Sequence, residues 1–296
     1  MINQVTKDKI NQLTDKYREL KNTHPEAIEA ISEVELPEMV YNSNAIENST
    51  LTLEDTEDIL IRNQIKTDHE IREIYEAKNL AKALRYLDEN PDEDLSNKLI
   101  LKLHKILLTD INDKVAGRYR SGNEWVRVGA HIGANPDFVE KMMTELVDEY
   151  NESNDYFLEK IGKFHAEFEN IHPFCDGNGR IGRVLINYQL AVEGLPPIII
   201  PNKTKNKNYY PLLEEYEHTG KIDGLVEELA GLTIEALYRR ITKMTAEKIV
   251  PVTEWARANE VDENSALNKA ARGTIPAFRM RGKWMIDEGY RETEEA

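Results

Sequence analysis

The sequence contains a single cysteine, Cys175, among 296 residues. One thiol excludes an intrachain disulfide and any zinc module built on several cysteines. Apolar runs are short too: the longest, such as Pro196–Pro201, fall far below the roughly 20 residues of a membrane-spanning helix. Residues 1–7 carry no apolar core of the kind that a secretory signal peptide needs. We therefore expect a soluble, cytoplasmic protein with no membrane partner.

Basic residues are also fewer than acidic ones. The chain has 38 Lys and Arg against 54 Asp and Glu, which gives a formal net charge of −16 at pH 7. This excess of negative charge disfavours general nucleic-acid binding, because the phosphate backbone attracts basic proteins. Hydrophobic residues make up 40% of the chain, enough for a packed core, and the length suggests about two domains.

Apolar residues at mixed three- and four-residue spacing predict that most of the chain is helical. The expected helices cover 6–33, 53–88, 96–108, 137–150, 155–170, 181–193, 208–218 and 222–247. Between Gly117 and Pro136, glycines lie among hydrophobic and polar residues, which is typical of a short hairpin or an irregular loop. No repeat of 20–50 residues is present.

The most informative segment runs from His172 to Arg183 and reads H-P-F-C-D-G-N-G-R-I-G-R. Its glycines permit backbone conformations that most residues avoid. A glycine-rich turn before a helix presents free N–H groups and the positive end of the helix dipole, which together bind phosphate. The candidate phosphate-binding amides belong to Gly177, Asn178 and Gly179.

The side chains of this segment predict the chemistry. Arg180 and Arg183 lie three residues apart on one helical face, and two guanidinium groups suit more than one phosphate. Asp176 offers a carboxylate to Mg²⁺, which commonly binds through one carboxylate plus phosphates. A neutral His172 imidazole can accept the proton of an attacking hydroxyl. Together these residues indicate phosphoryl or nucleotidyl transfer.

Other interpretations of the segment carry less weight. Gly177–Gly182 matches G-x-G-x-x-G, but no strand precedes it, as a dinucleotide-binding fold requires. Cys175 beside His172 is better explained as a buried spacer than as a thiol nucleophile. His165, His172 and Asp176 are an alternative transition-metal set, although His165 is better explained as packing within its helix. The sequence contains no G-x-x-x-x-G-K-[ST] motif, so a P-loop nucleotide site is not supported.

The segment resembles the signature of Fic-domain proteins, H-x-F-x-[DE]-G-N-G-R-x-x-R, at every specified position. The resemblance extends over roughly residues 20–247 and implies an all-α Fic fold with a small β-hairpin flap at about 124–134. Most family members transfer AMP from ATP to a protein hydroxyl. The resemblance therefore implies that His172 is the general base, that Phe174 anchors the loop, and that Asp176 holds Mg²⁺ between the α- and β-phosphates. Arg180 and Arg183 would neutralise the leaving pyrophosphate.

Two further sites are implied by the same resemblance. In the flap, Val126, Val128 and Ile132 would hold a target segment as an added strand. Tyr209 and Tyr210 match a tyrosine pair near the adenine pocket of the family.

An upstream segment, Ser43-Asn44-Ala45-Ile46-Glu47-Asn48, resembles the inhibitory motif of the family, [ST]-x-x-x-E-[GN]. It implies that Glu47, on a docked helix, pairs with Arg183 and keeps this arginine from the γ-phosphate. In some members the same glutamate positions a water that removes AMP from targets. The expected organisation is an N-terminal helical region at 1–95 that carries motif 43–48, followed by a Fic core at 96–248.

Residues 250–292 form a separate expected module, because Val250-Pro251 marks a boundary. The module resembles small excisionase-like winged helix-turn-helix domains, whose hairpin reads P-x-[FY]-R-x-x-G-x-W-x-I. Helix 265–272 would then be the recognition helix for DNA. The run 266–285 contains no acid and holds the candidate DNA contacts Lys269, Arg272, Arg279, Arg281 and Lys283. The alternative is a retained fold used for protein contact.

The principal hypothesis is an autoinhibited protein adenylyltransferase that uses Mg²⁺ with ATP and modifies a Ser, Thr or Tyr hydroxyl of a target protein or of itself. One alternative is a DNA-binding regulator whose Fic domain senses nucleotide. A second keeps the enzyme and changes the donor to one carrying UMP or phosphocholine. The oligomeric state is left open, with a homo-oligomer among the arrangements considered.

Overall fold

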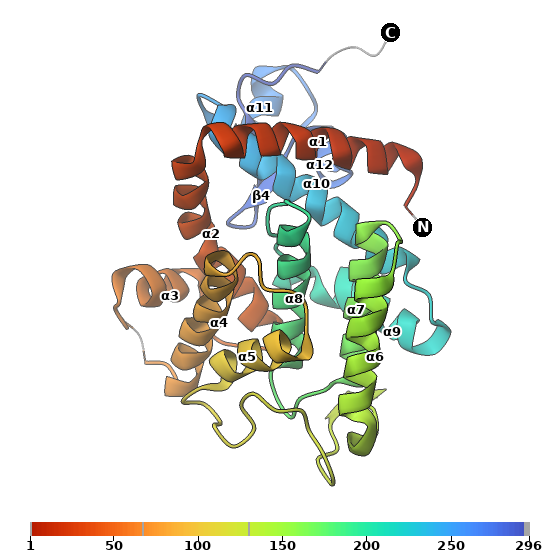
Figure 1. Ribbon diagram of the computed structural model, residues 1–296. Helices are drawn as coiled ribbons and strands as arrows, with labels where there is room; N and C mark the ends of the chain where they lie inside the picture. The colour runs from red at the N-terminus through yellow and green to blue at the C-terminus, as the bar shows by residue number, and fades with distance from the viewer. Residues whose placement is uncertain (1, 67, 130, 293–296) are drawn as a thin grey trace. The chain divides into compact units, whose positions relative to one another are not determined.

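The computed structural model describes residues 2–66, 68–129 and 131–292. In this part of the chain the structure is mostly helical (Figure 1), and no helix is long and apolar enough to cross a membrane. Contacts divide the chain into two units. The first unit holds Leu36–Glu193 and Ile199–Glu228, and the second holds Ile2–Glu35, Gly194–Ile198 and the described residues from Leu229 onward.

The first unit consists almost entirely of helices. They are the C-terminal part of α2 (Pro25–Ile46), α3 (Leu53–Glu57), α4 (Ile71–Glu89), α5 (Asn97–Leu108), α6 (Val139–Glu152), α7 (Phe157–Ile171), α8 (Asn178–Val192), α9 (Tyr210–Thr219) and the start of α10 (Asp223–Thr245). Short 3-10 or π turns cover 58–62, 136–138, 202–204 and 205–209. Helix α4 packs against α5, and α8 packs against α4, α5 and α7.

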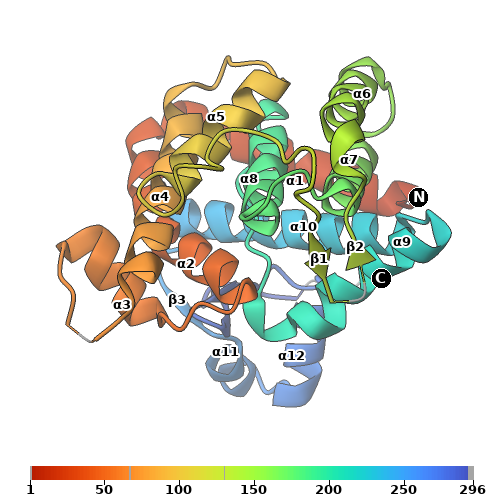
Figure 2. The same ribbon diagram turned by 90° about the horizontal axis from the view of Figure 1, so that it is seen from below.

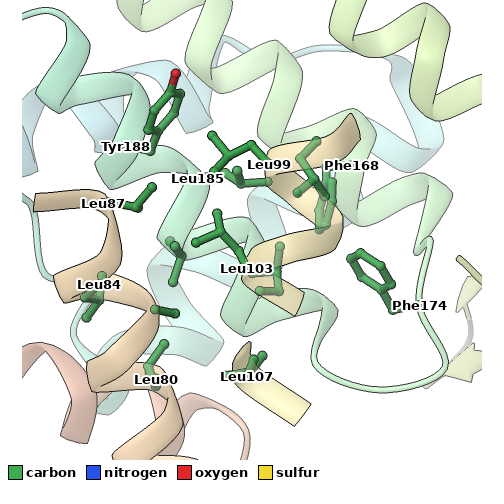
Figure 3. Close-up of a cluster of buried hydrophobic side chains, with 14 of the residues drawn as sticks. Leu80, Leu84, Leu87, Leu99, Leu103, Leu107, Phe168, Phe174, Leu185 and Tyr188 are labelled. Carbon is green, nitrogen blue, oxygen red and sulfur yellow. The ribbon is translucent and has the colours of Figure 1, made fainter. Parts of the chain in front are cut away.

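Leucine side chains from α4 and α5 form the centre of this unit (Figure 3). Helix α5 begins where the Ser96 side chain accepts a hydrogen bond from Leu99 N, and its apolar residues then recur every three or four positions. Phe168 from α7 and Leu185 from α8 complete the cluster, and each is at most 1% exposed. Burial of each such side chain contributes roughly 1.5–3 kcal/mol.

A two-stranded hairpin interrupts the helices (Figure 2). Strand β1 (Arg127–Val128) pairs antiparallel with β2 (His131–Ile132), so that Val128 lies opposite His131. The expected flap stretch 124–134 contains this hairpin, although Ala130 lies outside the described residues.

Two of the expected helical stretches each contain more than one helix. The stretch 6–33 divides into α1 (Gln4–Thr23) and α2, because Pro25 at the first position of α2 cannot donate a helical hydrogen bond. The stretch 53–88 divides into α3 and α4. After α3 the chain makes a π turn that ends at Asn63, which has a positive φ of 53° and is incompatible with a continuing helix.

The second unit ends in a small mixed module. It holds β3 (Ile249–Pro251), α11 (Val252–Ala258), α12 (Glu263–Ala271), β4 (Phe278–Met280) and β5 (Lys283–Asp287), and the antiparallel sheet has the order β3-β5-β4. Arg281 and Gly282 connect β4 to β5 with φ values of 51° and 75°, as a tight hairpin turn requires. Trp255, 2% exposed, packs at the centre of the module.

Candidate active site

The loop that carries His172 is fixed by a buried arginine. Helix α7 ends at Ile171, and His172 adopts a left-handed conformation with φ 52°. Arg120, fully buried, donates hydrogen bonds to the carbonyl oxygens of Ile171 (2.9 Å) and His172 (2.7 Å). The last carbonyls of a helix have no partner within the helix, so Arg120 satisfies them and orients the loop. No sequence pattern indicated Arg120.

Two more side chains close the loop from inside. Asn178 Oδ1 accepts a hydrogen bond from Phe174 N, and Asn178 Nδ2 donates to Phe174 O, both at 2.8 Å. The Phe174 ring is fully buried and stacks on His104 with a centroid separation of 3.7 Å. His104 Nδ1 accepts from Gly117 N (3.0 Å), so its Nε2 donates to Asp176 O (3.0 Å). The hydrogen bonds of His104 therefore position the loop.

Helix α8 begins directly after the glycine turn. Gly177 has a φ of 82°, a conformation that L side chains rarely adopt, and α8 starts at Asn178. The helix therefore begins earlier than the expected 181–193, and the N–H groups of its first turn include those of Asn178 and Gly179. A Cβ atom at Gly179 would collide with Glu47 Oε1, so only glycine permits this approach.

His172 is neutral in this environment. Its Nδ1 lies 3.2 Å from Glu169 O, which accepts the Nδ1 proton and leaves the Nε2 lone pair free. Burial lowers the pKa of His172 to about 4, despite the opposing hydrogen bond to Glu169. An imidazole with this pKa is a base at neutral pH.

Arg183 is held by both expected residues of the inhibitory motif. Its Nε donates to Ser43 Oγ (2.9 Å), and its Nη2 donates to Ser43 O (2.9 Å) and Glu47 Oε1 (2.8 Å). The Arg183 side chain is 7% exposed. Burial alone would raise the pKa of Glu47, but the Arg183 guanidinium outweighs burial and lowers it. Both groups are therefore charged, and Arg183 is fully compensated.

Further donors hold the end of the inhibitory helix. Lys205 Nζ donates to Ile46 O (2.7 Å) and Asn48 Oδ1 (2.9 Å), and Tyr210 donates its hydroxyl proton to Ile46 O (3.0 Å). Cations and donors at a helix C-terminus stabilise its carbonyls. These contacts fix the end of α2 against the segment 205–210. No local sequence pattern indicated Lys205.

Asp176 and Arg180 contact two residues of α4 that no sequence pattern indicated. Arg180 Nη2 lies 2.9 Å from Asp176 Oδ1, and its Nη1 lies 3.0 Å from Glu76 Oε1. Arg72 contacts the same two carboxylates, Glu76 through Nε at 3.0 Å and Asp176 through Nη2. Four charged side chains thus alternate in sign around a closed ring.

The donor set around Asp176 fits Mg²⁺ bound together with phosphates. The Asp176 side chain is 29% exposed, and Mg²⁺ needs only one or two protein carboxylates when phosphates complete its shell. Among the described residues, no three His, Cys, Asp or Glu side chains are placed to hold a metal ion. The alternative set of His165, His172 and Asp176 is therefore wrong for this structure.

A cavity of about 510 Å³ opens beside these side chains. Its walls include both the inhibitory carboxylate and the Asp176–Arg180 pair. The lining residues are Glu47, Asn48, Ser49, Thr50, Asp68, His69, Glu70, Arg72, Glu73, Glu76, Asp176 and Arg180.

The two tyrosines expected at the adenine pocket already form hydrogen bonds within the protein. Tyr209 is 2% exposed, and its hydroxyl lies 2.7 Å from His165 Nε2. Burial lowers the pKa of His165 to about 3, so this histidine is neutral. Tyr210 is half-buried against the end of α2.

The flap residues are accessible in part. Val128 and Ile132 are 53% and 50% exposed, whereas Val126 is half-buried and its carbonyl accepts a hydrogen bond from Gly133 N (3.2 Å). The flap is therefore open to another chain at β1 and β2.

The candidate DNA contacts do not form one open basic face. Arg279 makes a bidentate pair with Glu235, with Nε 2.9 Å from Oε2, and lies 5.1 Å above the Trp284 ring. Lys269 Nζ pairs with Glu292 at 2.7 Å. The exposed cations of the run are Arg272, Arg281 and Lys283.

Known proteins resemble this chain in sequence and in fold. The model of the Fic/DOC family matches residues 94–190, which include α5, α7, most of α8 and the whole segment from His172 to Arg183. The chain contains a Fic domain. The mostly helical Fic fold is shared with a solved Fic domain containing signaling protein from Bacteroides thetaiotaomicron. The TM-score is 0.72 and the identity 26%, over 80% of this chain and 96% of that one.

The curated relatives compared with this chain are named protein adenylyltransferases. Protein adenylyltransferase fic-1 of Caenorhabditis elegans is 30% identical over 210 residues, which cover 69% of this chain and 41% of the relative. Protein adenylyltransferase Fic of Nematostella vectensis is 31% identical over 239 residues, which cover 76% of this chain and 53% of the relative. The chain thus spans about half the length of these relatives.

Proposed function

We propose that this protein is an autoinhibited protein adenylyltransferase that transfers AMP from ATP to a hydroxyl group of a protein. The observation that carries the proposal is the grouping of a neutral His172, the Asp176 carboxylate and the guanidinium groups of Arg180 and Arg183 around the first turn of α8. The relatives, of which this chain matches about half the length, are named protein adenylyltransferases, and these names support the same activity.

The proposed reaction assigns one task to each group. His172 Nε2 accepts the proton of a Ser, Thr or Tyr hydroxyl, whose oxygen then bonds to the α-phosphorus. The bond from this phosphorus to the bridging oxygen breaks, and pyrophosphate leaves. Amides of Gly177, Asn178 and Gly179 bind phosphate oxygens. Arg180 and Arg183 neutralise the charge that collects on the leaving group.

Mg²⁺ would be held by Asp176 and would neutralise charge on the bridging phosphates. The residues around Asp176 support this assignment, because one accessible carboxylate faces a cavity large enough for phosphates. ATP is the donor that the relatives' names favour, and a different phosphate-linked donor is the alternative.

Autoinhibition is proposed to act through Glu47. As long as Glu47 and Ser43 hold Arg183, its Nε and Nη2 donors are not available to the γ-phosphate. ATP must therefore displace Glu47 to bind with Arg183 engaged. An additional role of Glu47 in removing AMP from targets belongs to the same proposal.

The remaining assignments concern the target and the adenine. Val126, Val128 and Ile132 are proposed to hold the target segment, and the exposure of Val128 and Ile132 supports this role. Tyr209 and Tyr210 are proposed to line the adenine pocket through their ring edges, because their hydroxyl groups are already hydrogen-bonded.

The proposed organisation has a helical region at 1–95, a catalytic core at 96–248 and a winged helix-turn-helix module at 250–292. Helix α12 and the β4–β5 hairpin support the last assignment. Arg272, Arg281 and Lys283 favour DNA as a second partner, whereas the pairs of Lys269 and Arg279 count against their use. Salt-sensitive binding of duplex DNA by the full chain, weakened by Arg281→Ala with Lys283→Ala, is the expected result. Equal binding by both proteins would contradict it.

Label transfer tests the activity itself. Wild type, Glu47→Gly and Glu47→Gly/His172→Ala are each incubated with a cell lysate, Mg²⁺ and ATP labelled at the α-phosphate. We expect weak protein labelling by wild type, strong labelling by Glu47→Gly and none by the double variant. Unlabelled ATP should compete better than UTP or CDP-choline. Competition in the reverse order would move the donor away from ATP.

A further inference from the structure

The charged ring of Arg72, Glu76, Asp176 and Arg180 suggests a role for α4 in nucleotide binding. Arg72 and Glu76 lie one helical turn apart on α4, and both face the loop before α8. Each guanidinium contacts both carboxylates, so the ring carries no net charge. In this arrangement the carboxylates of Glu76 and Asp176 compensate the positive charge of Arg180.

The four members are buried to very different degrees. The side chain of Arg180 is 4% exposed and that of Glu76 13%, whereas Asp176 is 29% and Arg72 52% exposed. A nearly buried guanidinium without a carboxylate is strongly unfavourable, so Arg180 must keep an anionic partner. A half-exposed guanidinium exchanges its partner for water at little cost. Arg72 is therefore the member that can leave.

Both carboxylate oxygens of Asp176 already accept a hydrogen bond from an arginine. Its Oδ1 accepts from Arg180, and its Oδ2 accepts from Arg72. A divalent cation on Asp176 would stand beside the Arg72 guanidinium, and the two positive charges would repel each other. Glu76 is the only ring member that can then keep both arginines compensated.

We propose that Arg72 competes with the divalent cation for Asp176, and that Glu76 is a positioning residue that relieves this competition. Glu76 holds Arg180 beside the phosphate site and draws Arg72 away when the cation arrives. This inference rests on the proposed function, because it assumes that the cation and the nucleotide bind at Asp176 and Arg180. It assigns to α4 a part in setting how much Mg²⁺ the protein needs.

Opposite substitutions should have opposite effects. Removing the competitor in Arg72→Ala is expected to lower the Mg²⁺ concentration for half-maximal nucleotide binding, by about three- to tenfold. Glu76→Gln leaves both arginines dependent on Asp176 and is expected to raise this concentration by a similar factor. The readout is equilibrium binding of α,β-methylene-ATP, whose α–β bridge cannot be cleaved by AMP transfer, measured by calorimetry at a series of Mg²⁺ concentrations, so it does not depend on turnover.

Two matched controls separate contact from general charge. Lys78→Ala removes a positive charge from an exposed position of the same helix. Glu89→Gln removes a negative charge from an exposed position at the end of the same helix, where Glu89 does not line the cavity. Both should change the half-saturating Mg²⁺ concentration by less than about twofold. Glu76→Asp keeps the charge at shorter reach and should shift the concentration less than Glu76→Gln, and it replaces Glu76→Gln if that variant does not fold.

All variants are made in the Glu47→Gly background, so that Arg183 is available. If Glu47→Gly itself binds no α,β-methylene-ATP with Mg²⁺, the proposed function fails. If it binds, but Arg72→Ala and Glu76→Gln shift the Mg²⁺ requirement no more than their controls or in the same direction, the role of α4 is refuted and the proposed function stands.

Discussion

Replacing Glu47 by glutamine should make the protein bind nucleotide more tightly and unfold more easily. Glutamine removes the negative charge that compensates Arg183 and keeps the size of the side chain. The free protein then loses an ion pair with N···O 2.8 Å, while the contacts of Arg183 with Ser43 remain. Nucleotide no longer has to break this pair when it binds.

The expected size of the affinity gain depends on the solvent exposure of the Arg183–Glu47 ion pair. Arg183 is 7% exposed and Glu47 is 40% exposed, so the pair is intermediate between the two limiting cases. Exposed pairs are worth about 0–1 kcal/mol, whereas breaking a buried pair costs about 3–5 kcal/mol. We expect about 1–2 kcal/mol, which corresponds to about five- to thirtyfold tighter binding of the γ-phosphate-bearing nucleotide. The loss in unfolding free energy should be of the same size.

Calorimetry with α,β-methylene-ATP and Mg²⁺ measures the affinity, and urea unfolding measures the stability. Asp68→Asn is the matched control, because Asp68 lines the same cavity and the substitution removes the same charge. It should change the affinity by less than about twofold. Equal affinities for Glu47→Gln and Asp68→Asn, or a Glu47→Gln variant as weak as wild type, would refute the inhibitory contact.

Three further results are expected. Because the pKa of His172 is about 4, transfer by Glu47→Gly should stay level from pH 8 to 6 and fall only below about pH 5; a midpoint near 6.5 would contradict the burial of this base. Burial raises the pKa of Glu169 to about 8, so its stabilising contribution disappears as the pH rises from about 4.5 to 8, and Glu169→Gln should gain about 1–3 kcal/mol over wild type between pH 5 and pH 8 in urea unfolding. A constant difference would contradict this. Phe174→Ala should lose about 3–5 kcal/mol in the same assay, since its ring is fully buried, and a loss below 1 kcal/mol would contradict its anchoring role.

The sequence predicted the parts of the site that lie in one continuous segment. From His172 to Arg183 the glycine turn, the helix start and the charged groups follow one another, so local conformation alone brings them together. The contact of Glu47 with Arg183, which spans 136 residues, could be predicted only because its motif resembles a known one.

The residues that position the site were not predictable in this way. Arg120, His104, Lys205 and the α4 pair contact the loop or the inhibitory helix from distant parts of the chain. Each one is an ordinary residue in an amphipathic or polar stretch, so its role depends on tertiary packing. The break at Asn63 was missed for a similar reason, since helical spacing continues on both sides of it.

The most direct test of the proposed activity compares two labelled forms of ATP on the Glu47→Gly variant. Label on the α-phosphate should appear on protein, and label on the γ-phosphate should appear only in released pyrophosphate. Transfer of the α-label, abolished by His172→Ala, is the result that AMP transfer through His172 predicts. Protein labelled from the γ-phosphate, or α-label transfer that survives His172→Ala, would contradict it.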